Sequence, residues 1–215
     1  MNIQHNNKDR KNDMEHNILN AASELFLQKG YRNTSTTEIA RLAGCNQALV
    51  YYYYRSKENL FTTMFVNRTE QIFSKIIEPF LQKQDLISTV KSIIEAYFDF
   101  LRQNERLAFF LINELIINDD NRNLIVKEFE KNITRIEVFF LFDQQVREEV
   151  AKGHVRPLET FDLMMNIISL CVSTLVSKPI IQQAVFGGDC DTTEEYLDHR
   201  KQEITNLIIN GIKPL

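Results

Sequence analysis

The chain has 215 residues, of which 44% are hydrophobic and 25% charged, and its formal net charge is −4. This length allows one domain or two small ones with a buried core, and the composition excludes a disordered or fibrous protein. The first residues contain no basic and apolar leader and the apolar runs are short, so we expect no signal peptide, no membrane span and a cytoplasmic location.

Charge is distributed unevenly along the chain. Residues 1–60 hold eight basic and six acidic side chains, a balance of +2, whereas the remainder holds 17 and 23, a balance of −6. A mildly basic N-terminal part on an acidic body favours a negatively charged partner for that part. Chance variation in a small balance is the alternative interpretation.

The low content of 6 Gly and 4 Pro favours helices, and the first helix is predicted between Asn12 and Gly30. Asn12 and Glu15 form a pair typical of a helix N-terminus, and Gly30 supplies a common C-terminal stop. Apolar and small residues recur every three or four positions between these ends: Ile18, Ala21, Ala22, Leu25 and Phe26. One face of this helix is therefore expected to be buried.

Two short helices are predicted next. Ser35 and Glu38 form a capping box that begins the helix TTEIARLA, and Gly44 ends it because glycine adopts a positive φ without strain. Asn46 is the predicted cap of the following helix, over residues 47–54. Short helices separated by a glycine turn are typical of a helix-turn-helix, in which the first helix presents the second to a DNA groove.

A fourth helix is predicted to begin at Lys57, after a cap at Ser56, and to continue without Gly or Pro as far as Pro79. The helix-turn-helix pattern is preceded by ILNAASELFLQKGY and followed by Y-x-Y-x-x-SKENLF. With these flanking motifs, residues 14–61 resemble the DNA-binding unit of the TetR family of bacterial transcriptional regulators. The rest of the chain resembles that family only in its length and helical pattern.

We therefore expect an all-α protein. Residues 1–60 are predicted to form an N-terminal three-helix helix-turn-helix domain with a flexible N-terminal arm, joined by a continuous helix to a helical-bundle effector-binding and dimerisation domain at 61–215. Predicted helices from the joining helix onward lie at roughly 57–83, 85–103, 105–118, 121–152, 158–177 and 192–211. Turn and cap signals support their ends, namely Gly153 with Pro157, Lys178 with Pro179, Gly187 with Gly188, and Thr192 with Glu195.

The four consecutive tyrosines divide between two faces of the helix over residues 47–54. At about 100° per residue, Val50 and Tyr54 fall on one side with Tyr53 at its margin, and we expect this side to pack in the core. The other side carries Gln47, Ala48, Tyr51 and Tyr52, which we expect to face the major groove. The family usually has Phe at the position of Tyr54, so its hydroxyl needs a partner or a path to water. Simple half-buried packing is the alternative for Tyr51 and Tyr52.

Side-chain chemistry indicates what these residues contact on double-stranded DNA. Gln47 can form a bidentate pair with adenine, Ala48 allows close approach to a thymine methyl, and Tyr51 can bind a phosphate. Thr36 and Thr37 offer hydroxyls and backbone amides to phosphates. The complete predicted set is Thr36, Thr37, Asn46, Gln47, Ala48, Leu49, Tyr51, Tyr52 and Lys57.

Basic residues outside this helix provide further candidate phosphate contacts. Lys57 adds a charge at the start of the fourth helix. Lys8, Arg10 and Lys11 lie in the predicted arm, which could follow the DNA backbone or enter the minor groove. A solubilising tail is the alternative for the arm.

A homodimer is expected because the stretch FDLMMNIISLCVSTLV is apolar on nearly every side of a helix. Such a helix must be covered on both sides, by the core of its own chain and by a partner. We expect it to pair across a twofold axis with the last helix, through residues 158–177 and 192–211, as the family resemblance also implies. Core packing within a monomer is the alternative.

The family resemblance implies a small, often apolar effector that releases the protein from a palindromic operator, so we expect a repressor. Candidate effector-binding residues are Phe98, Phe110, Asn113, Glu114, Phe139, Met164 and Met165. Ordinary core packing is the alternative for the Phe and Met residues. An effector-independent DNA-binding protein, with an architectural or cell-division role, is the second functional hypothesis, and a helical carrier or enzyme is the third.

No catalytic constellation or metal site is predicted. Cys45, Cys171 and Cys190 are far apart and are read as reduced thiols, although an exposed Cys190 leaves a redox-sensing role open. The four histidines are isolated. We therefore expect no enzymatic activity, no metal and no cofactor.

Overall fold

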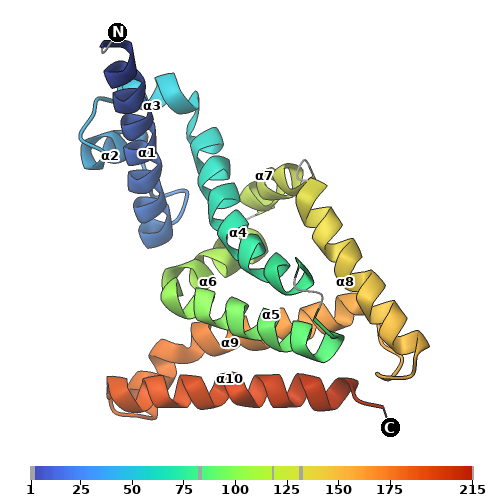
Figure 1. Ribbon diagram of the computed structural model, residues 1–215. Coiled ribbons are helices and arrows are strands. Elements are labelled where there is room, and N and C mark those ends of the chain that lie inside the picture. Colours follow the sequence, from blue (N-terminus) through green and yellow to red (C-terminus); the bar gives the residue numbers. More distant parts are fainter. Residues whose placement is uncertain (1–2, 82–83, 118, 131–132, 215) are drawn as a thin grey trace. The chain divides into compact units, whose positions relative to one another are not determined.

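The structure is a computed structural model, shown in Figure 1, and it describes residues 3–81, 84–117, 119–130 and 133–214. Every regular element in these ranges is helical, which confirms the predicted all-α class. The helices belong to two compact units.

The first unit comprises Met1–Thr69 and Phe110–Lys131. Its helices are α1 (Ile3–Lys29), α2 (Thr36–Leu42), α3 (Gln47–Tyr54), the first half of α4 (Lys57–Leu81), the end of α6 (Glu105–Leu111), the π-helix η1 (Ile112–Ile117) and α7 (Asp119–Glu130). Besides residues 1–60, this compact unit includes the first half of α4 and a later stretch of chain. The division into a DNA-binding domain at 1–60 and an effector-binding and dimerisation domain at 61–215 stays a prediction.

The second unit comprises Glu70–Phe109 and Asn132–Leu215. It contains the remainder of α4 and α6 together with α5 (Leu86–Gln103), α8 (Ile133–Ala151), α9 (Thr160–Ala184) and α10 (Cys190–Ile212). Helices α5, α9 and α10 pack against one another, as Figure 1 shows. The continuous helix expected between the two domains is α4, which has residues in both units.

The caps predicted for the two short helices are confirmed. Ser35 Oγ accepts from the Glu38 amide at 3.2 Å, and Glu38 Oε2 accepts from the Ser35 amide at 3.0 Å. Asn46 Oδ1 accepts from the Leu49 amide at 3.0 Å and so begins α3. Gly44, between them, has φ 69°, the left-handed conformation expected of a turn glycine.

The predicted start of the first helix was wrong. Helix α1 begins at Ile3 rather than at Asn12, so the segment expected to form a flexible arm, with Lys8, Arg10 and Lys11, is helical. The physical reason is that residues 3–12 contain neither Gly nor Pro and therefore nothing that stops a helix.

Two boundaries in the second unit also differ from prediction. Helix α9 continues through Pro179 to Ala184 instead of ending at 177, because one proline removes a single helical hydrogen bond and tertiary packing can hold the helix on both sides of it. Helix α10 begins at Cys190 because Asp189 caps it, with Oδ1 accepting from the Asp191 amide at 3.0 Å. The predicted cap pair Thr192 and Glu195 therefore lies inside this helix.

Two predicted helices are interrupted by positions outside the described residues. The helix predicted over 121–152 corresponds to α7 and α8, and residues 131–132 between them are not described. The helix predicted over 105–118 corresponds to α6 followed by η1, with residue 118 outside the described ranges.

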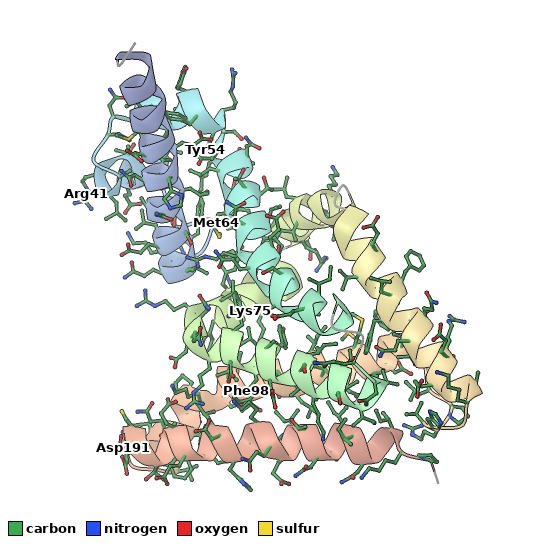
Figure 2. All side chains as sticks on the ribbon, in the orientation of Figure 1. Arg41, Tyr54, Met64, Lys75, Phe98 and Asp191 are labelled. Atoms are coloured by element: carbon green, nitrogen blue, oxygen red, sulfur yellow. The ribbon has the colours of Figure 1, made fainter. Side chains whose placement is uncertain are left out.

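The core of the first unit holds α3 in place. Val50 and Tyr54 are 2% and 5% exposed, and they are buried together with Ile18, Phe26 and Ile39 of α1 and α2. The Tyr54 hydroxyl donates to the carbonyl oxygen of Glu15 at 3.0 Å, so the partner that this hydroxyl required is a backbone group of α1. Figure 2 shows the Tyr54 ring on the side of α3 that faces α1.

The burial of Tyr54 leads to a stability prediction. Tyr54→Ala should lower the free energy of unfolding by about 3 to 5 kcal/mol, because a large buried ring is removed. Tyr54→Phe should cost only about 1 kcal/mol, since it removes one hydrogen bond and keeps the ring. Urea denaturation followed by circular dichroism measures both, with Tyr52→Ala as an exposed control. A Tyr54→Ala protein as stable as this control would show that the ring does not anchor α3.

Candidate DNA-binding surface

Helix α3 has the two faces predicted from its sequence. Opposite the buried pair Val50 and Tyr54, the side chains of Tyr51 and Tyr52 are 46% and 61% exposed, and Tyr53 is intermediate. Gln47 and Ala48 are exposed as well. The packing prediction for all four tyrosines is thus confirmed, and the contact of the outer face with DNA stays a prediction.

Thr36 links the two predicted contact residues at the start and the middle of α3. Its Oγ1 accepts a hydrogen bond from Gln47 Nε2 at 2.7 Å and lies 3.3 Å from the hydroxyl oxygen of Tyr51. Thr36 is buried, with 7% of its surface exposed, whereas the neighbouring Thr37 is exposed. The two threonines, which the sequence treats alike, therefore differ in what their hydroxyls can reach.

Asn46 and Leu49 have local roles in α3. The Asn46 side-chain oxygen is engaged in capping the Leu49 amide. Leu49 is only partly exposed, on the margin between the two faces. Both residues lie beside the outer face, and their side chains contribute to its shape.

Lys57, predicted to bind phosphate, is held by an aromatic ring. Its Nζ lies 4.3 Å from the centroid of the Tyr31 ring, in a cation–π contact. Burial lowers the pKa of Lys57, and the charges of Glu58 and Glu114 oppose that shift. The Tyr31 hydroxyl donates to Glu58 Oε1 at 2.9 Å, so the ring is fixed beneath the lysine.

Two exposed cations near α3 were missed by the sequence analysis. Arg41 lies in the last turn of α2, on its outer side in Figure 2, and Arg55 lies in the turn between α3 and α4. Arg55 has φ 66°, an unusual conformation for a residue with a side chain. For Arg55, the sequence signal for a DNA contact was a basic residue in the turn directly after the predicted recognition helix.

Phe110 and Glu114, predicted to bind an effector, belong to the first unit. The Phe110 ring lies 5.7 Å from the ring of Phe61 and 6.4 Å from that of Phe65, centroid to centroid. The residues around it in the chain are apolar because this stretch packs against the aromatic rings of α4. That these two side chains contact an effector stays a prediction.

Glu114 is a buried acceptor for the loop that follows α1. Only 1% of the residue is exposed, and its Oε1 accepts from the Tyr31 backbone amide at 3.0 Å and from Asn113 Nδ2 at 3.2 Å. Its Oε2 accepts from Asn121 Nδ2. Gly30 has φ 77°, and a Cβ there would lie 3.1 Å from Glu114 Oε1, so glycine provides both the turn and the space.

Four of the other effector candidates lie on three helices of the second unit, and the fifth, Asn113, lies in the first. Phe98 is fully buried in α5, and Phe139 is partly buried on α8 with its ring 6.2 Å from that of Phe140. On α9, Met164 is partly buried and Met165 is 44% exposed. Asn113 of the first unit is exposed.

A hollow of about 290 Å³ lies between α9 and α10 in the second unit. Its wall includes Leu163, Leu170 and Ile208, with Arg156 beside them, and the Arg156 amide donates to the Ile212 carbonyl at 3.0 Å. None of the seven effector candidates lines this hollow. Within the described part of the chain, no group of three or more His, Cys, Asp or Glu side chains could hold a metal ion.

Residues 18–64 match the family described as "Bacterial regulatory proteins, tetR family". Over 203 residues, 91% of this chain and 93% of the relative, the chain is 24% identical to the fatty acid metabolism regulator protein of Bacillus subtilis. Over 147 residues, 68% of this chain and 67% of the relative, it is 22% identical to the nucleoid occlusion factor SlmA of Mannheimia succiniciproducens.

Similarity to a solved structure extends over both units of the chain. The crystal structure of the transcriptional regulator FadR from Bacillus subtilis in complex with stearoyl-CoA has a TM-score of 0.67 and 18% identity. The match covers 92% of this chain and 98% of that one. At this identity the likeness establishes the fold.

The buried position of Glu114 leads to a second stability prediction. Glu114→Ala should lower the free energy of unfolding by about 1 to 3 kcal/mol, because the part-buried Tyr31 amide loses its acceptor. Asn123→Ala, at an exposed position of α7, is the control and should change stability by less than about 0.5 kcal/mol. Chemical denaturation gives both values, and equal stability of the two variants would contradict a structural role for Glu114.

Proposed function

Because the chain belongs to the TetR family of bacterial regulatory proteins, we propose that it is a cytoplasmic homodimeric repressor that a small, largely apolar effector releases from its operator. The observation that carries this proposal is the two-sided α3, which buries Val50 and Tyr54 and exposes Gln47 and Tyr51. An exposed face with an amide, a small residue and a phenol suits the donor and acceptor pattern of the major groove.

The charge around α3 supports binding to a polyanion. Arg41, Arg55 and Lys57 provide cations on α2, in the turn after α3 and at the start of α4, and phosphates are the groups that such cations position. Lys57 keeps its side chain over the Tyr31 ring, so it loses little further freedom when it binds. A single unit with few cations binds weakly, which favours two units on one operator.

The apolar surface of α9 and α10 supports a dimer. Phe161 and Ile180 of α9 are 62% and 71% exposed, and Leu207 of α10 is 60% exposed. Helix α9 is also long and apolar enough to cross a membrane by length and composition, with 22% of its most apolar window buried. We propose that a second copy of the chain covers the apolar surface of α9 and α10 and that its side chains enter the hollow beside Leu163.

Helices α4 and α6 provide the route by which an effector would act, because each has residues in both units. In the first unit, Phe110 and Glu114 connect the end of α6 and η1 to the aromatic rings of α4 and to the loop after α1. A ligand that stabilises another conformation of α4 or α6 would change these contacts. A coupling of about 1 to 3 kcal/mol is typical for such switches.

Long-chain acyl-CoA is the first effector class to test. A relative named as a fatty acid metabolism regulator and a structure of similar fold in complex with stearoyl-CoA support this choice. Among the candidate effector contacts, Phe98, Phe139, Met164 and Met165 lie in the second unit.

An effector-independent DNA-binding role is the second candidate function. The similarity to the nucleoid occlusion factor SlmA favours it. The two functions differ in one respect that can be measured, since only the first requires a ligand that changes affinity for DNA.

The DNA-binding proposal predicts a sequence-specific complex. In vitro selection followed by gel-shift should yield a palindromic site at moderate salt. Tyr51→Phe should weaken binding to that site about 5- to 10-fold through the loss of one phosphate hydrogen bond, with the free energy of unfolding unchanged. Tyr54→Phe, which changes a buried hydroxyl of the same helix, is the control. Failure to select any preferred sequence would refute the regulator proposal.

The effector proposal predicts stabilisation and release by the same ligand. Stearoyl-CoA at 100 times its dissociation constant should add about 2.7 kcal/mol to the free energy of unfolding, measured by thermal shift. The same concentration should weaken operator binding in the gel-shift. A ligand that binds tightly and leaves operator affinity unchanged argues for the effector-independent role.

A further inference from the structure

The Thr36 hydroxyl lies between the residue predicted to read a base and the residue predicted to bind a phosphate. Gln47 Nε2 donates to Thr36 Oγ1 at 2.7 Å, and the hydroxyl oxygens of Thr36 and Tyr51 are 3.3 Å apart. These bonds join the first residue of α2 to the first and second turns of α3. The 7% exposure of Thr36 leaves little of its surface for a direct contact with DNA.

We propose that Thr36 is a positioning residue for sequence recognition, which orients the Gln47 amide for a base, and that it is not a phosphate contact. The inference rests on the proposed DNA-binding function and assigns a different role to one of its predicted contact residues. Thr37, exposed beside it, keeps the role of phosphate contact.

The direction of the hydrogen bonds follows from the chemistry of the phosphate. A phosphate diester oxygen can only accept, so a Tyr51 hydroxyl bound to it must donate its hydrogen outward. The Tyr51 oxygen is then free to accept from the Thr36 hydroxyl, and the Thr36 oxygen accepts from Gln47 Nε2. Binding of the phosphate by Tyr51 thus fixes Gln47 with its nitrogen toward Thr36.

The fixed amide presents the groups that adenine requires. Thr36 uses one Nε2 hydrogen of Gln47, which leaves the other hydrogen and Oε1 of this exposed residue for a further partner. This donor and acceptor pair matches N7 and the N6 amino group of adenine in the major groove. Because the amide is already held in the free protein, less side-chain freedom is lost when the base is bound.

Thr36→Val in the full-length chain tests the role of the hydroxyl, with Thr36→Ser retaining it. Dissociation constants are measured for the site selected by the wild-type protein, for its single base-pair variants and for random DNA. Thr36→Val should weaken the selected site about 5- to 10-fold and change random-DNA affinity by less than about twofold. Thr36→Ser should bind like wild type, and Thr37→Val should weaken both kinds of DNA by the same factor.

A double-mutant cycle with Gln47→Ala tests the connection itself. In the Gln47→Ala background, Thr36→Val should have no further effect, because the group that it positions is gone. Tyr51→Phe removes the hydroxyl at the other end of the hydrogen-bond series Gln47–Thr36–Tyr51. It should therefore reduce discrimination at the same base pair as Gln47→Ala does. If Thr36→Val does not fold, Tyr51→Phe still tests whether these hydrogen bonds contribute to base discrimination.

Two results would overturn the inference. Equal weakening of selected and random DNA by Thr36→Val would show a phosphate contact, and full additivity with Gln47→Ala would show that the two residues act independently. A wild-type protein without sequence preference is a different result, since it would refute the DNA-binding proposal itself.

Discussion

The burial of Tyr54 is the constraint on which the candidate DNA-binding surface depends. Its ring is 5% exposed and its hydroxyl donates to the Glu15 carbonyl of α1, so both the depth and the rotation of α3 are set. Successive residues of a helix are about 100° apart, and fixing Val50 and Tyr54 inward therefore directs Gln47 and Tyr51 outward. The capping of α3 by Asn46 sets where this helix begins.

A second constraint comes from a distant part of the chain. Glu114 binds the amide of Tyr31, which lies 83 residues earlier, and Phe110 packs on rings of α4. The first unit is thus assembled from two separate stretches of sequence. A buried polar group that loses its partner destabilises the protein. A change around Glu114 would therefore destabilise the loop after α1.

The local features were predictable from sequence because their signals are local. The Ser35 and Glu38 box, the Asn46 cap and the inward spacing of Val50 and Tyr54 each involve residues within a few positions of one another. The same reasoning explains why the tyrosine run divides into buried and exposed rings.

The tertiary contacts were not predictable in this way. The sequence around Glu114 shows a carboxyl group in an apolar helix, which fits a ligand pocket as well as it fits the Tyr31 amide. The hydroxyls of Thr36 and Thr37 look equivalent in the sequence, and only the packing of α2 against α3 separates them. Proline usually ends a helix, yet α9 continues past Pro179, because tertiary packing can hold the helix on both sides of the proline.

Hydroxyl-radical footprinting on the selected operator tests most directly whether the outer face of α3 reads DNA as a pair of related units. A dimer with two recognition helices should protect two patches on one face of the duplex, centred about 34 Å apart or a multiple of that distance. The Gln47→Ala variant should lose this pattern at the concentration where the wild-type protein shows it. A single uninterrupted patch, or the same pattern with Gln47→Ala, would contradict recognition by paired α3 helices.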